Sequence, residues 1–243
     1  MSARITLATA ARVLEQIRHD RRTIALLLVV PSALLFLLSE MLGAAEFDRL
    51  GAPMLGMFPF ITMFLVTSIA MLRERTSGTL ERLMTMPLAK LDLLGGYGLA
   101  FALLAAVQAL VTSAFVFLVL GLDTPGDPAL IVGLAVLDAV LGSALGLLAS
   151  AFASSEFQAV QFMPAFVLPQ ILLCGLFVPR DQMAGWLDAI ASVLPLTFAF
   201  DALDAVSVDG SGLGGVSDEI AVLVAMAAVA IGLGALTLRR RTA

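Results

Sequence analysis

The sequence has few of the side chains with which soluble enzymes do chemistry. It contains one cysteine (Cys174), one histidine (His19) and a single lysine (Lys90). One cysteine excludes an intrachain disulfide, and one histidine excludes a multi-histidine metal site. No G-x-x-x-x-G-K-[ST] pattern is present, so the sequence carries no P-loop of its own. The formal net charge of −5 also argues against a nucleic-acid-binding surface.

Charged residues are scarce, and long apolar stretches replace them. They make up 14% of the 243 residues and hydrophobic residues 60%, against about 25% and about 45–50% in soluble chains. A membrane helix needs about 20 mostly apolar residues. We therefore expect an all-α integral membrane protein, with one transmembrane permease domain over residues 1–243. Its six expected spans are residues 23–39, 50–72, 93–122, 128–155, 157–179 and 220–238.

The basic residues are distributed unevenly among the loops. Twelve of the fourteen lie in the N-terminal segment, in the loop between the second and third spans, or at the C-terminus. Only Arg49 and Arg180 fall in the other loops. Because Lys and Arg concentrate on the cytoplasmic side of membranes, we expect both termini to be cytoplasmic.

Residues 4–22 have the periodicity of an amphipathic helix. At 100° per residue, Leu7, Val13 and Ile17 share one face, while Arg4 and Arg12 lie on the opposite one. Such a helix lies flat in the headgroup region of a bilayer. It acts either as an anchor only, or as a lever that also touches a cytoplasmic partner.

The loop at residues 73–87 is unusually charged. It has five charges within its first ten residues, and Pro87 disfavours a helix beyond residue 86. Gly78 is a suitable helix start, which gives an expected two-turn helix with Leu80 and Leu83 on one face and Glu81 pointing away. So short a helix is unstable alone. It is therefore interpreted as a docking segment, the alternative being an ordinary solvated loop.

The outer segment at residues 180–219 holds two pieces too short to span a bilayer, 182–193 and 195–206. We expect a re-entrant helix–turn–helix that enters the outer leaflet part-way, with Pro195 at the turn. Trp186 suits a position at the membrane interface.

Asp138 is the one ionisable residue deep in an expected span. A carboxylate there is costly unless it faces protein, water or a partner. One interpretation is a substrate pathway, in which Asp138 contacts a cationic amphiphile or carries a coupling proton. The other is a structural tie to Gln108 or Thr112 on the third span. Gly142 and Gly146, spaced for close helix packing, serve either the bundle or a dimer.

Two sequence motifs lie in the segments described above, one after the second expected span and one from the fifth span into the outer segment. The first is Arg73-Glu-Arg-Thr-Ser-Gly-Thr-Leu-Glu-Arg-Leu83 followed by Pro87-Leu88. The second joins Leu168-Pro169, Gly175-Leu-Phe-Val-Pro179, Gly185-Trp-Leu187 and Leu194-Pro-Leu-Thr-Phe-Ala-Phe-Asp-Ala-Leu203. Together they resemble the permease subunits of type-2 ABC exporters, in the daunorubicin-resistance class of drug-efflux permeases. One departure is Gly96-Tyr97, where many relatives have Gly-Lys.

The resemblance implies a transport subunit without catalytic residues, metal or cofactor of its own. A separate P-loop ATPase would bind ATP and Mg²⁺, and the permease would pair with itself or with a sister chain in a bacterial plasma membrane. The cargo would be a hydrophobic or amphipathic drug, antibiotic or lipid. The implied ATPase-coupling residues are Glu74, Arg75, Thr76, Gly78, Thr79, Leu80, Glu81 and Leu83.

Two other function classes fit less well. A proton-coupled secondary transporter would use Asp138, but such proteins usually contain internal repeats, and the sequence has no convincing one. An intramembrane protease or lipid phosphatase needs a constellation of catalytic groups, for which one His, one Cys and one intramembrane Asp are too few.

Overall fold

The computed structural model describes residues 3–79 and 90–237, and these form helices and no strand. The first half contains α1 (Ala3–His19), α2 (Arg21–Leu42), α3 (Ala44–Thr76) and α5 (Lys90–Leu118). The second half contains the helices α6 (Pro128–Ala149), α7 (Glu156–Leu173), α8 (Gly185–Ala191), α9 (Pro195–Ser207) and α10 (Ser217–Leu236), with short 3-10 turns η1 (Arg180–Gln182) and η2 (Leu213–Gly215).

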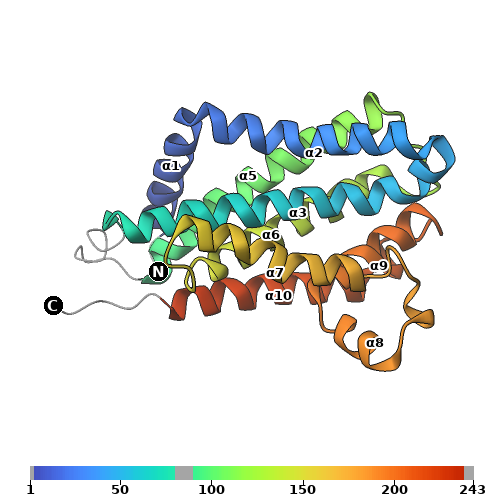
Figure 1. Cartoon of the computed structure of the whole chain (residues 1–243). Helices are drawn as coiled ribbons and strands as arrows, with labels where there is room; N and C mark the ends of the chain where they lie inside the picture. Colours follow the sequence, from blue (N-terminus) through green and yellow to red (C-terminus); the bar gives the residue numbers. More distant parts are fainter. Residues whose placement is uncertain (1–2, 80–89, 238–243) are drawn as a thin grey trace.

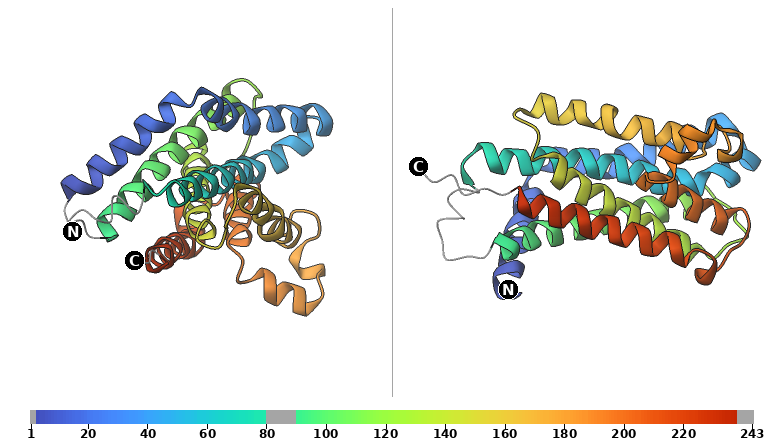
Figure 2. Two further views of the ribbon diagram at one scale, coloured as in Figure 1. Left: turned by 60° about the vertical axis from the view of Figure 1, so that its left-hand side comes forward. Right: turned by 90° about the horizontal axis from the view of Figure 1, so that it is seen from below.

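Among the described residues, five helices are long and apolar enough to cross a membrane: α2, α3, α5, α6 and α10. The all-α membrane fold is thus confirmed. The expected fifth span is the exception in composition, because α7 has 18 residues, of which one is glutamate and three are glutamine. It nevertheless runs beside α3 through the bundle (Figure 1). The start of α1 and the ends of α3 and α10 lie at one end, in both Figure 1 and Figure 2.

The core is organised around α3 and α6. In each, 61% of the most apolar window is buried, compared with 17% in α2 and 22% in α10. A Cβ atom added to Gly142 or Gly146 would lie 2.4 Å from the carbonyl oxygen of Phe60 or Phe64 on α3. Backbones can approach this closely only where one residue has no side chain. The glycine pair therefore serves the bundle within the chain.

Polar residues mark where the helices begin. Asp20 caps α2 by accepting hydrogen bonds from the backbone N–H of Thr23 at 3.2 Å and from its hydroxyl at 2.7 Å. Asp127 caps α6 by accepting from the N–H of Ala129 at 2.9 Å, with Pro128 in the first turn. The predicted N-terminal helix therefore ends at His19, and Asp20 separates it from the first span.

The expected helix–turn–helix between the last two spans is present. Helices α8 and α9 are bent by 88° with respect to each other, and Pro195 is the first residue of α9. Most of α9 is buried against α3, α6 and α10, whereas α8 projects from the bundle (Figure 2) and exposes 68% of Trp186. Arg180 holds the two together through ion pairs with Asp188 at 2.8 Å and Asp201 at 3.1 Å.

Candidate functional site

The end of α3 carries the first residues of the predicted coupling segment. At 1.5 Å per residue its 33 residues extend about 50 Å, well beyond the roughly 30 Å of a hydrocarbon core. The helix therefore continues past the predicted span end at residue 72, and includes Arg73–Thr76. Ser77 closes it by donating its N–H to the carbonyl of Arg73, and Gly78 follows with φ of +72°. This left-handed turn favours glycine, so Gly78 ends α3 as well as preceding the expected coupling helix.

Glu74 faces inward, toward α1 and α5. Its side chain is 8% exposed, and Oε1 lies 3.5 Å from a guanidinium nitrogen of Arg12 on α1. The same guanidinium donates a hydrogen bond to the hydroxyl of Tyr97 on α5 and lies 5.5 Å from the centre of its ring. The three side chains thus join α1, α3 and α5 through one partly buried polar contact. Glu74, one of the predicted coupling residues, therefore contacts α1 within the chain.

The neighbouring residues of α3 make two further ties. Arg73 donates from Nε and a terminal nitrogen to both oxygens of Glu156, at 2.8 and 3.0 Å, and so binds the start of α7. Arg75 donates to the hydroxyl of Thr237, just beyond α10, at 3.4 Å. Three consecutive residues of the last turn of α3 therefore hold three different parts of the chain.

The remaining predicted coupling residues are more accessible or lie beyond the description. Thr76 is exposed, Gly78 and Thr79 are half-buried, and the hydroxyl of Thr79 lies 3.0 Å from that of Ser77. Leu80, Glu81 and Leu83 lie outside the described residues. Thr76–Thr79 is consequently the accessible part of the predicted coupling segment within the described chain.

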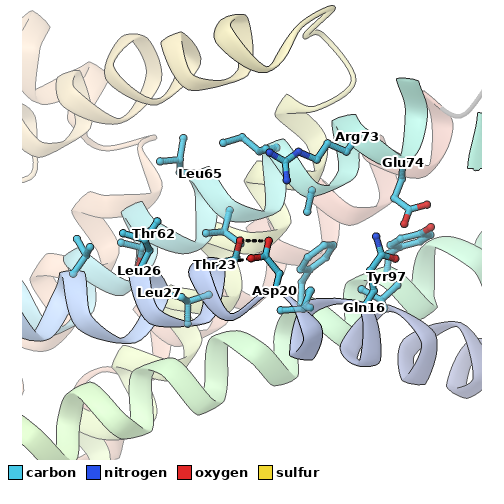
Figure 3. Close-up of a pocket in the computed structure, with 17 residues that line it drawn as sticks. Gln16, Asp20, Thr23, Leu26, Leu27, Thr62, Leu65, Arg73, Glu74 and Tyr97 are labelled. Carbon is cyan, nitrogen blue, oxygen red and sulfur yellow. Dashed lines mark hydrogen bonds between the residues drawn. The ribbon is translucent and has the colours of Figure 1, made fainter. Parts of the chain in front are cut away.

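A cavity of about 420 Å³ lies beside this turn, between α1, α2, α3 and α5 (Figure 3). Its walls toward the middle of the bundle are apolar, and include Leu26, Leu27 and Val66. Asp20 and Glu74 border its polar end. The volume is in the range of small-molecule sites.

The predicted substrate-pathway residues do not line this cavity. Asp138 is 1% exposed and neither carboxylate oxygen has a hydrogen-bond partner among the described residues. Gln108 donates its side-chain amide to the hydroxyl of Thr62 on α3, and the hydroxyl of Thr112 is buried and accepts or donates no hydrogen bond there. The expected tie between Asp138 and Gln108 or Thr112 is therefore absent. Asp138 packs instead toward Gly56, where an added Cβ would lie 3.1 Å from Oδ2.

Sequence reasoning missed Arg12 and Tyr97 as members of the site. The sequence places Arg12 on the polar face of the N-terminal helix, yet its side chain reaches across to α3 and α5. The available indication was Tyr97, which departs from the Gly-Lys that the family resemblance implied; its hydroxyl accepts a hydrogen bond from the guanidinium of Arg12. No group of three or more His, Cys, Asp or Glu residues in ranges 3–79 and 90–237 is arranged to hold a metal.

Comparison with known proteins identifies the family. The family model for the ABC-2 type transporter matches residues 5–207. The chain belongs to the ABC-2 type transporter family. Its match thus takes in α1, the turn at the end of α3 and the α8–α9 pair, but stops before α10.

Several named relatives share part of this sequence. It is 27% identical over 168 residues to ABC transporter G family member 20 of Dictyostelium discoideum, covering 68% of this chain and 23% of the relative. It is 29% identical over 143 residues to the probable multidrug ABC transporter permease YbhR of Escherichia coli K12, covering 59% and 39%. The linearmycin resistance permease protein LnrN of Bacillus subtilis is 24% identical over 213 residues, covering 87% and 55%. The chain thus matches about a quarter to about half of these relatives' lengths.

Proposed function

We propose that this chain is the membrane-spanning permease subunit of an ATP-driven exporter, and that a separate P-loop ATPase docks on residues 73–87. The observation that carries the proposal is the last turn of α3, where Arg73, Glu74 and Arg75 bind three other parts of the chain. A force applied just beyond this turn would reach α1, α5, α7 and the end of α10 together. Relatives named as ABC transporter permeases support the same role.

We assign separate roles in transport to the partner ATPase and to this chain. ATP and Mg²⁺ would be bound by the partner, which would supply the free energy of hydrolysis. This chain would receive the resulting movement through Thr76–Thr79 and the following helix, with Leu80 and Leu83 buried in the partner's groove and Glu81 paired with a basic group. Glu74 would act within the chain, by holding α1 against α3.

The cargo we propose is hydrophobic or amphipathic, as a drug, antibiotic or lipid would be. Two of the relatives are named as a probable multidrug permease and a linearmycin resistance permease. Asp138, Gln108 and Thr112 remain proposed pathway residues, which would become accessible only when α3, α5 and α6 separate.

We further propose a bacterial plasma membrane, cytoplasmic termini and a dimer with a second copy or a sister permease. The charge distribution supports the orientation, because the start of α1 and the ends of α3 and α10, beside which most basic residues lie in the sequence, share one end of the bundle (Figure 1). Exposed apolar side chains on α2 and α7, including Val29, Phe157 and Leu172, would face lipid or the second permease.

The test is purification of the tagged permease from its native membrane in mild detergent, with mass spectrometry of co-purifying proteins. A P-loop ATPase at about 1:1 is expected. Glu81→Arg should lose the ATPase while the permease stays monodisperse. Glu40→Arg, the same substitution at the opposite end of the bundle, should retain it. Retention by both variants would refute docking on residues 73–87, and absence of an ATPase from the wild type would refute the proposed partner.

A further inference from the structure

The cavity between α1, α2, α3 and α5 has the two-part character of an amphiphile site. One part is an apolar channel that follows α2 and α3, bordered by Leu26, Leu27, Val30 and Val66. The other is a polar end at the α1–α2 junction, where Asp20 lies opposite the last turn of α3 (Figure 3). An occupant that satisfies both parts has a hydrocarbon body and a polar head.

The charges at the polar end favour a cationic head. Arg73 is the cationic residue among the described lining, and both oxygens of Glu156 outside the cavity already bind it. Glu74 also borders the cavity, and its charge is offset by Arg12 at 3.5 Å. Asp20 makes no ion pair within the described part of the chain. Asp20 is therefore the carboxylate at the head of the cavity that makes no ion pair within the described residues, although Arg73 lies near enough to interact with it electrostatically and the start of α2 carries a partial positive charge.

Local hydrogen bonds also favour the ionised form of the Asp20 carboxyl group. The hydroxyl and backbone N–H of Thr23 donate hydrogen bonds to its carboxylate, and these bonds lower the pKa of Asp20 below its ordinary value. A carboxylate at the edge of an apolar channel attracts an ammonium group more strongly than it would in bulk water. An anionic head would instead meet Asp20 and find the guanidinium of Arg73 occupied.

We propose that this cavity binds an amphiphile with an ammonium head, placing the head at Asp20 and the hydrocarbon chain between α2 and α3. The site goes beyond the proposed export function, because it lies in a single permease chain and needs neither nucleotide nor a partner. Two sources share the required chemistry: an amine-headed lipid of the surrounding bilayer, and a free cationic amphiphile that enters from it.

The test measures binding of radiolabelled dodecyltrimethylammonium to the purified permease in phosphatidylglycerol nanodiscs, with empty nanodiscs subtracted. Saturable binding is expected. Asp20→Asn should weaken it about tenfold or more, because a charge-assisted contact is lost while asparagine still caps α2. Glu15→Gln is the matched control: it removes an exposed carboxylate from α1 that does not border the cavity, and binding should be unchanged.

A second pair of variants tests the apolar channel without touching the helix cap. Leu26 borders the cavity but is 63% exposed, so Leu26→Trp fills the channel at little risk to the fold. Leu37→Trp makes the same change further along α2, at a residue that is 54% exposed and does not border the cavity. Leu26→Trp should reduce binding about tenfold, and Leu37→Trp should leave it unchanged.

Competition separates the two sources. If phosphatidylethanolamine added to the nanodiscs displaces the labelled amphiphile, an amine-headed lipid is the resident occupant; if it does not, the site selects free cationic amphiphiles. The proposal is overturned by non-saturable binding, by equal binding to the wild type, Asp20→Asn and Leu26→Trp, or by displacement with dodecyl sulfate as effective as with the ammonium compound. None of these outcomes depends on an ATPase, so failure here and failure of the proposed export function are distinguishable.

Discussion

The contact between Arg12, Glu74 and Tyr97 makes a measurable prediction about stability. The Glu74 side chain is 8% exposed and that of Arg12 36%. Removing one partner of a fully buried ion pair costs about 3–5 kcal/mol, because the other charge stays buried and unpaired. Arg12→Met should cost less, about 2–3 kcal/mol, since water still reaches the outer part of this site.

The companion variants separate pairing from burial. Glu74→Gln removes the charge but keeps a polar group near Arg12, and should cost about 1 kcal/mol. The double variant no longer buries an unpaired carboxylate, so its cost should fall at least about 1 kcal/mol short of the sum of the two single costs. Such a coupling energy measures the tie between α1 and α3 directly.

The single cysteine provides the assay. Cys174 is fully buried on the opposite part of the bundle, so a thiol-reactive fluorogenic dye reports unfolding without a new label. At about 2–4 °C per kcal/mol for a chain of this size, Arg12→Met should lower Tm by about 5–10 °C. Arg18→Met is the control, because Arg18 is 80% exposed and its pair with Glu15 spans 3.8 Å, so its change should stay near zero. Equal shifts for Arg12→Met and Arg18→Met, or strict additivity in the double variant, would refute the reasoning.

Three further substitutions test other parts of the fold with the same assay. Gly142→Val should destabilise by at least about 3 kcal/mol, because its Cβ would lie 2.4 Å from the carbonyl oxygen of Phe60 and backbone must move; a wild-type Tm would exclude the close α3–α6 crossing. Gly78→Ala should cost about 1 kcal/mol through its φ of +72°, since no described atom lies within 4 Å of an added Cβ. Gly98→Ala, at a helical glycine where an added Cβ likewise meets no described atom, should not destabilise. Arg180→Met should free α8 from α9, detected as faster proteolysis near Trp186 with a nearly unchanged Tm; unchanged proteolysis would exclude the tie to Asp188.

The architecture was predictable from the sequence because membrane spans are local. An apolar run of about 20 residues has few alternatives to a helix in a bilayer, so α2, α3, α5, α6 and α10 could be placed before the structure was known. The paired short helices α8 and α9 were equally visible, because each is too short to span and Pro195 breaks the run.

The helix boundaries were less predictable, for a physical reason. An expected span stops at its first charged residue, but a helix continues as long as its charges find partners. Arg73 and Glu74 pair with residues 83 and 62 positions away in the sequence, so α3 extends through them to Thr76. Nothing local in residues 73–76 distinguishes such an extension from a solvated loop.

Contacts between helices were the least predictable feature. Periodicity shows which face of a helix is polar, but not which neighbour that face meets or at what height. One interpretation tied Asp138 to Gln108 or Thr112, but Gln108 bonds to Thr62 on α3. A shift of one turn along a helix axis moves a side chain by about 5.4 Å, enough to exchange one partner for another.

Because α3 packs in two hydrophobic cores, a movement of its last turn affects helices on both sides of it. Phe60 and Phe64 pack in the core shared with α6, α7, α9 and α10, while Met63 and Met71 pack in the core shared with α1 and α5. Close-packed interiors transmit displacement rather than absorb it. A shift of α3 along its axis therefore acts on both cores at once. The contacts of Arg73, Glu74 and Arg75 should make the ends of the neighbouring helices move together with α3. Cutting one tie should uncouple one neighbour and leave the others connected, so single substitutions in this turn should differ in kind and not only in degree.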